Sequence, residues 1–151
     1  MANLIKSFLS KQDLNDIAAA IKEAEKHTSG EIRVAIRQKR SKKEKELSVE
    51  QVARLEFVHL GMMKTHERTG ILIFVLLEAR EFFILADEHI NQKVEPRSWH
   101  AVAEVMAAQF AKKEFRQGLL AAVKSVGEHL AVHFPAKPGH KNELSNKVDI
   151  S

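Results

Sequence analysis

The chain has 151 residues, of which 44% are apolar, and a formal net charge of +4 with no cysteine. This length suits one ordinary domain, and the apolar content excludes a chain that is disordered throughout. The lack of cysteine excludes a disulfide framework, a thiolate metal site and a cysteine nucleophile.

Signals for a membrane or for export are not found in the sequence. No stretch reaches the roughly 18 apolar residues that a membrane span needs. Residues 1–8 lack the apolar core of a secretory signal. We therefore expect a cytoplasmic protein without a membrane span.

A helix followed by a strand is predicted at the start of the chain. Ser10 can cap a helix whose third residue, Asp13, faces the helix dipole, and an apolar stripe with helical spacing continues to near His27. Glu31–Arg37 then alternates apolar and polar side chains. This alternation indicates a strand that is less buried than a central one and lies near a sheet edge.

A basic loop, defined here as residues 39–46, follows this strand. Its cations could contact nucleic acid or an acidic protein partner. No aromatic side chain is interleaved for base stacking, so a solvated loop is favoured over a nucleic-acid site. Because the loop contains no apolar residue, we expect it to be dispensable for folding. The cations are Lys39, Arg40, Lys42, Lys43 and Lys45.

The second helix and a central hairpin come next. Ser48 and Gln51 form a capping-box pattern that opens a helix running to about Met63. Two short apolar runs, Ile71–Leu77 and Phe82–Ala86, indicate buried strands. Their short connection predicts an antiparallel hairpin. The unbroken apolar character of the first run predicts that helices cover both of its faces.

Two further helices are predicted after the hairpin. One carries an apolar stripe that begins at Trp99, which we expect to be a core residue, and the other runs from Phe115 to near Phe134. Residues 135–151 contain two of the three prolines and show no periodicity. They are therefore predicted to form a disordered tail.

These elements predict an α/β fold, with a small mixed β-sheet sandwiched between α-helices in a single domain. The strand–helix–strand order makes residues 31–37 and 71–77 parallel, whereas the hairpin adds an antiparallel strand. We assign residues 1–134 to this domain and residues 135–151 to the tail.

Two groups of polar side chains are candidates for a metal site. His129 and His133 have the i, i+4 spacing of zinc ligands, but they lie near a helix end with no acid between them, so ordinary polar roles are favoured. Glu67 precedes the first hairpin strand, and Asp87 and Glu88 follow the second. Antiparallel pairing brings these carboxylates to one edge of the sheet.

The carboxylates at this edge could serve in two ways. They could hold a hard cation such as calcium or magnesium, or they could carry out acid–base chemistry together with His89. The alternative interpretation is a solvated sheet edge with loop charges.

The order of the elements and several local motifs resemble a known family. The motifs are Ser-Gly-Glu-Ile-Arg-Val at 29–34, Arg-Thr-Gly-Ile-Leu-Ile-Phe-Val at 68–75, Phe-Ile-Leu-Ala-Asp at 83–87 and Phe-Arg-Gln-Gly-Leu at 115–119. Together they are similar to the TPM domain, a module of a thylakoid-lumen protein, a photosystem repair factor and many bacterial proteins. The resemblance covers residues 8–134.

The resemblance implies a compact α/β sandwich and two candidate activities, acid phosphatase and calcium binding. Other members are viewed as accessory or interaction domains. The family commonly has Asp-Asn-Gly before the central strand, where this chain has Arg68-Thr69-Gly70. The missing aspartate removes one oxygen ligand and places a fixed positive charge beside the three carboxylates.

We therefore expect a non-catalytic accessory or binding domain, with an unknown protein partner. The sequence identifies no definite cofactor, and we expect calcium or magnesium to bind weakly at most. The alternative is a weak, divalent-cation-dependent acid phosphatase that uses Glu67, Asp87 and Glu88, with Arg68 and His89 contacting a phosphate or a partner.

Overall fold

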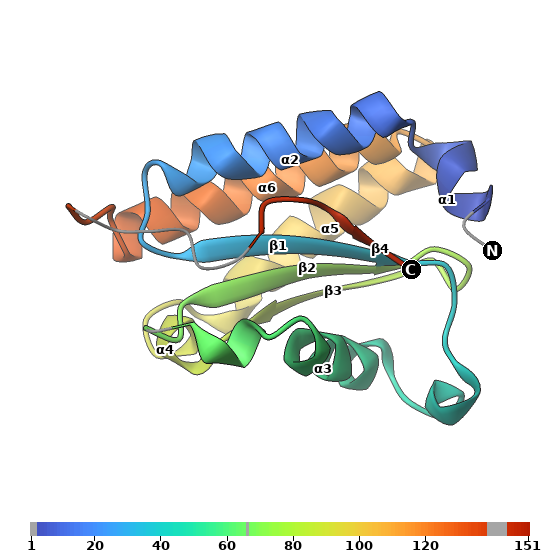
Figure 1. The fold of residues 1–151 in the computed structure, drawn as a ribbon, viewed down its shortest axis with the longest axis horizontal. Helices are drawn as coiled ribbons and strands as arrows, with labels where there is room; N and C mark the ends of the chain where they lie inside the picture. The colour runs from blue at the N-terminus through green and yellow to red at the C-terminus, as the bar shows by residue number, and fades with distance from the viewer. Residues whose placement is uncertain (1–2, 66, 139–144) are drawn as a thin grey trace.

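A computed structural model describes residues 3–65, 67–138 and 145–151. In this part of the chain, helices lie on both faces of one sheet (Figure 1). No helix among these residues combines the length and the apolarity that are needed to cross a membrane. The elements are α1 Asn3–Phe8, α2 Lys11–Glu25, β1 Glu31–Arg37, the 3₁₀ turn Lys42–Glu44, α3 Val49–His59, the 3₁₀ turn Met62–Lys64, β2 Gly70–Leu76, β3 Glu81–Ala86, α4 Glu88–Asn91, α5 Pro96–Ala111, α6 Phe115–His133 and β4 Asp149–Ile150.

The sheet has the strand order β3-β2-β1-β4. β1 and β2 are parallel, with Glu31 opposite Gly70 and Arg37 opposite Leu76. β2 and β3 are antiparallel, with Ile71 opposite Ala86. The predicted mixed sheet, its parallel pair and its hairpin are therefore confirmed.

Alternation along β2 gives the molecule two apolar cores. Ile71, Ile73 and Val75 pack in a core with α2, α5 and α6, whereas Leu72 and Phe74 pack in a second core with α3. Every residue of β2 is buried, as a strand covered on both faces requires. In Figure 1, α2 and α6 lie above the sheet and α3 lies below it.

The helix starts follow the local signals of the sequence. Ser10 and Ser48 each cap their helix in a full capping box, with Asp13 and Gln51 as the reciprocal partners. The second helix ends earlier than predicted, at His59, and a 3₁₀ turn replaces its last turn. Helix α1 is an addition that the sequence reading did not identify.

The C-terminal segment differs from the predicted disordered tail at both of its ends. Pro135 forms a β-bridge with Thr28. Val148 is buried in the larger core, and β4 pairs in parallel with β1. The reason is that β1 has a free edge whose backbone groups need hydrogen-bond partners. Residues 139–144 lie outside the described residues.

Candidate functional site

The carboxylates predicted to converge do lie at one corner of the sheet, which we call the acidic corner. It comprises Glu67, Arg68, Asp87, Glu88 and His89. The antiparallel register places Asp87 beside the start of β2, where its backbone N–H donates to the Gly70 carbonyl at 2.9 Å. The His89 ring Nδ1 lies 3.0 Å from the Glu67 carbonyl oxygen, so the two segments are in direct contact.

Asp87 is the central side chain of the acidic corner, and it is 5% exposed. Its two carboxylate oxygens each accept a hydrogen bond from the Arg68 guanidinium, at 2.9 Å from Nε and 2.9 Å from Nη2. Oδ1 also accepts the Glu88 backbone N–H at 2.7 Å, which caps α4. The hydrogen bonds that Arg68 donates to Asp87 raise the pKa of Arg68 above its ordinary value. The charge of Asp87 is thus balanced by the half-buried Arg68 guanidinium.

The remaining members of the acidic corner, Glu67, Glu88 and His89, each have different contacts. Glu67 pairs with Lys137 at 2.5 Å. Glu88 is exposed, with its carboxylate 3.9 Å from the Arg68 guanidinium. The His89 ring packs edge-on against Phe134, which anchors the corner to the end of α6. Among the described residues, no three His, Asp or Glu side chains are placed to share a metal ion.

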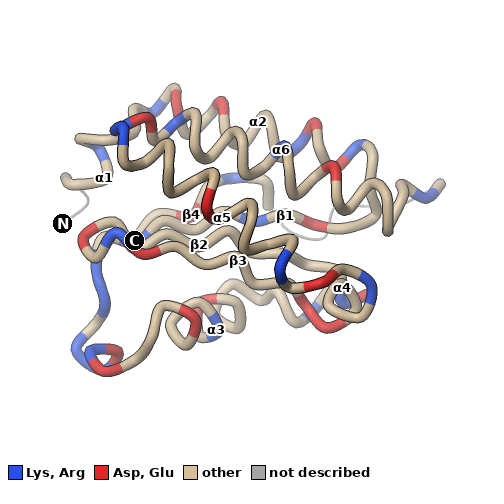
Figure 2. Tube along the Cα trace, turned by 180° about the vertical axis from the view of Figure 1, so that it is seen from behind, with Lys and Arg blue, Asp and Glu red and all other residues tan. Residues whose placement is uncertain are grey.

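The basic loop connects β1 to α3, and Figure 2 shows basic and acidic residues interspersed along it. Four of its five predicted cations are exposed, and these are Lys39, Lys42, Lys43 and Lys45. Arg40 instead donates to the Leu47 carbonyl at 3.0 Å and pairs with Glu81 of β3 at 2.7 Å. The loop is therefore tied to the sheet by one of its own cations.

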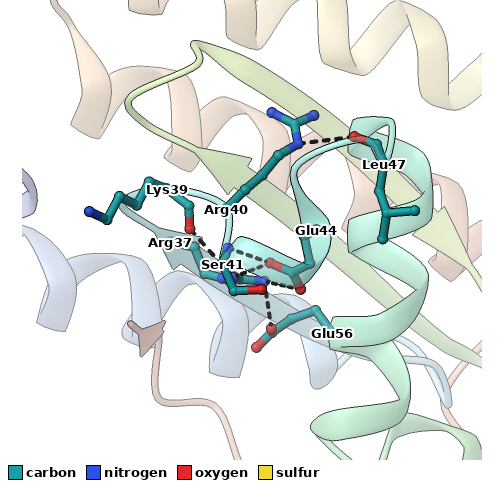
Figure 3. Close-up of polar contacts among 7 residues, drawn as sticks. All are labelled: Arg37, Lys39, Arg40, Ser41, Glu44, Leu47 and Glu56. Carbon is teal, nitrogen blue, oxygen red and sulfur yellow. Dashed lines mark hydrogen bonds and ion pairs between the residues drawn. The ribbon is translucent and has the colours of Figure 1, made fainter.

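A second polar cluster, missed in the sequence, fixes the loop more firmly. Arg37 at the end of β1 donates to both oxygens of Glu44, at 2.6 and 3.1 Å, and lies 3.7 Å from Glu56 of α3 (Figure 3). All three side chains are largely buried. The pattern Ser41-x-x-Glu44 is a capping box that could have revealed the 3₁₀ turn.

This cluster argues against the expectation that the basic loop is dispensable for folding. Glu44 belongs to the loop, and without it the Arg37 guanidinium would lose its bidentate partner in a mostly buried position. The cluster also forms part of the wall of a cavity of about 750 Å³, which His59 and Asp149 line as well. The loop therefore has a structural role that composition alone does not show.

The two acids of this cluster have opposite electrostatic environments. Hydrogen bonds from Arg37 lower the pKa of Glu44 to about 2. Burial raises the pKa of Glu56, and the charge of Arg37 offsets that rise only in part. Glu44 is therefore the carboxyl group of this cluster that stays charged to the lower pH.

Stability in acid should depend on Glu44. A carboxyl group whose pKa is lower in the folded state stabilises the fold above its ordinary pKa, and that contribution is lost as the pH falls through the folded value. We expect the free energy of unfolding to fall from pH 4.5 toward pH 2, and Glu44→Gln to flatten part of this fall. Urea denaturation at a series of pH values measures it, with the exposed Glu23→Gln as control. Identical slopes for Glu44→Gln and the natural chain would contradict the assignment.

The histidine pair of the sequence reading has ordinary contacts. His129 Nδ1 lies 2.8 Å from the Ser125 carbonyl oxygen, and its ring packs against Trp99. His133 is exposed in the last turn of α6.

Comparisons with known proteins agree with this architecture. A family model described as the TPM domain matches residues 5–129. The NMR structure of the BA42 protein from the psychrophilic bacterium Bizionia argentinensis is similar, with a TM-score of 0.85 and 35% identity over 95% of this chain and 96% of that one. The N-terminal domain of the cg2496 protein from Corynebacterium glutamicum shares the fold, with a TM-score of 0.61 and 16% identity over 81% of this chain and 74% of that one. No protein with a curated description matches.

Proposed function

Because the chain belongs to the TPM domain family, we propose that it acts as a non-catalytic binding or accessory domain. The observation that supports this most directly is the bidentate ion pair between Arg68 and the buried Asp87. By the resemblance, other members of the family have an aspartate at the position of Arg68. In this chain the Arg68 guanidinium is instead bound to the Asp87 carboxylate, which a divalent cation would need as a ligand.

The electrostatics of the acidic corner support the same proposal. A metal-dependent hydrolase needs carboxylates free to hold the cation that activates a water molecule. Here Asp87 is paired with Arg68, and Glu67 is paired with Lys137. A divalent cation would have to displace Arg68 and Lys137 from these carboxylates before it could gather enough oxygen ligands. Generic phosphate esters should therefore be hydrolysed at a rate near background.

A weak, divalent-cation-dependent acid phosphatase is the second candidate. The observation in its favour is the convergence of Glu67, Asp87 and Glu88 with His89 at one corner. The Arg68 side chain is 34% exposed, so it has room to swing into solvent and free Asp87. In that arrangement the guanidinium could contact a phosphate group instead.

Replacing Arg68 with aspartate tests whether this arginine is what keeps calcium out of the acidic corner. Arg68 has a left-handed backbone with φ of 56°, which aspartate tolerates well, so the exchange should not disturb the turn. We expect calcium affinity to rise by roughly tenfold or more, because one cation leaves and one oxygen ligand arrives. An amide-shift titration measures this, and calcium should also raise the melting temperature of the variant.

The matched control is Arg80→Asp, which makes the same charge change at another left-handed position, outside the acidic corner. It should leave calcium binding unchanged. Saturable calcium binding by the natural chain, lost in Asp87→Asn and accompanied by calcium-dependent hydrolysis of p-nitrophenyl phosphate, would instead establish the phosphatase.

A further inference from the structure

A pocket of about 330 Å³ opens at the end of the molecule opposite the acidic corner. It lies where α1, the turn between β2 and β3, and the turn between α5 and α6 meet (Figure 1). We call it the phenylalanine pocket. Its lining residues are Phe8, Leu77, Arg80, Phe82, Ala107, Phe110, Ala111, Lys113 and Phe115.

Four aromatic rings line the pocket. Phe110 packs edge-on against both Phe82 and Phe115, with ring centroids 4.8 and 5.0 Å apart. Phe8 packs against Phe115 at 4.4 Å. Three of these four rings, those of Phe8, Phe82 and Phe115, are only partly buried, whereas Phe110 is 8% exposed. An apolar group in the pocket would remove this aromatic surface from water, which is favourable.

The charged residues of the pocket are of one sign. Arg80 and Lys113 are exposed, and neither side chain forms a hydrogen bond or an ion pair with the described residues. The nearby acid Glu81 is already paired with Arg40. By contrast, Arg37 and Arg68 have carboxylate partners within the protein. The phenylalanine pocket is thus lined by two cations that form no ion pair with the described residues.

The backbone at both cations is unusual. Arg80 and Lys113 have left-handed φ values of 55° and 63°, where glycine is the residue without steric penalty. Lys113 follows α5 in a Schellman turn, in which its N–H donates to the Phe110 carbonyl and the Glu114 N–H donates to Gln109. A basic side chain is therefore present at each of two positions where the backbone alone favours glycine.

From this combination we propose that the phenylalanine pocket binds a small organic acid with one aromatic ring or a short alkyl chain. The apolar part occupies the space between the phenylalanine rings, and the carboxylate lies between Arg80 and Lys113. The volume is near the lower end of the range for small-molecule sites, which suits a ligand of about one ring. This inference is independent of the function proposed for the acidic corner.

The recognition chemistry can be tested with three probes, phenylacetate, phenylacetamide and acetate. Phenylacetate carries the ring and the charge, phenylacetamide carries the ring alone, and acetate carries the charge alone. We expect saturable amide shifts with phenylacetate at Phe110, Phe115 and Gly118. Phenylacetamide should bind roughly tenfold more weakly, because it loses charge-assisted hydrogen bonds. Acetate should produce no saturable shift.

Two variants test the cations without endangering the fold. Arg80→Gly and Lys113→Gly each remove one charge and relax a left-handed backbone, so both proteins should fold at least as well as the natural chain. Each should weaken phenylacetate binding by roughly tenfold. The control Lys112→Ala removes an adjacent exposed cation outside the pocket and should leave binding unchanged.

The Ala107→Leu variant tests whether the ligand occupies the pocket itself. It places a larger side chain in the pocket wall and should abolish phenylacetate binding. Equal affinities for phenylacetate and phenylacetamide, or full binding by Lys113→Gly, would overturn the proposal. So would concentration-dependent dimerisation with shifts at the same residues and none with phenylacetate, because a second copy of the chain would then cover the pocket.

Discussion

Replacing Trp99 with alanine should lower the free energy of unfolding by about 3–5 kcal/mol, as truncations of buried aromatic residues do. Trp99 lies near the start of α5, is 3% exposed and packs against the His129 ring of α6. The change leaves a cavity that the surrounding helices fill only in part. For a chain of this size the melting temperature should fall by about 6–20 °C.

The matched control is Trp99→Phe. The indole Nε1 is buried without a hydrogen-bond partner among the described residues, so phenylalanine removes an unsatisfied donor along with some volume. We expect this variant to lose much less stability than the alanine variant. Urea denaturation followed by circular dichroism measures both. An unchanged midpoint for Trp99→Ala would show that the side chain does not belong to the core.

Arg37→Met should lower the free energy of unfolding by about 2–4 kcal/mol, which is the second large effect that we expect. Removing one member of a buried ion pair leaves the partner charges buried without an opposite charge. The Arg37 side chain is 13% exposed, and the side chains of Glu44 and Glu56 are 12% and 8% exposed. Without the guanidinium, the carboxylates of Glu44 and Glu56 would both lose the ion pair that they form with Arg37. The pKa of Glu44 should then rise from its value of about 2.

The double variant Arg37→Met/Glu44→Gln tests this explanation. Glutamine can still accept the Ser41 backbone N–H that Glu44 Oε1 accepts at 2.8 Å, so the 3₁₀ turn should persist. The double variant should therefore be more stable than Arg37→Met alone, measured by urea denaturation at neutral pH. Additive losses from the two single changes would mean that the ion pair contributes no coupling energy.

Local signals account for the parts of the fold that the sequence predicted well. The caps at Ser10 and Ser48 depend on side chains three residues away, so a short window contains the whole motif. The strand β2 could be predicted because the run Ile71–Leu77 is entirely apolar, as expected for a strand covered on both faces. The two-residue strand β4 carries no periodicity, and only the free edge of β1 explains why it forms.

In the candidate site, too, some features could be predicted from the sequence and others could not. Antiparallel pairing was enough to predict that Glu67 and Asp87 lie at one corner. That Asp87 takes Arg68 as its partner depends on the backbone of a left-handed residue, which no sequence pattern displays. The contact between Arg37 and Glu56 joins a strand to a helix that lies a loop away, so residue spacing gives no sign of it.

The side-by-side packing of α2 and α6 has a consequence for the order of folding. The Thr28 hydroxyl reaches the Phe134 carbonyl, 106 residues along the chain, and Arg116 reaches Asp16 across 100. Closing so long a loop costs chain entropy, and this cost arises before the long-range contacts can stabilise the closed loop. Residues 31–86, by contrast, form the parallel pair, the hairpin and the α3 core from one continuous stretch. We therefore expect this stretch to form the folding nucleus. The apolar side of α2 then stays open to water until α6 completes the larger core.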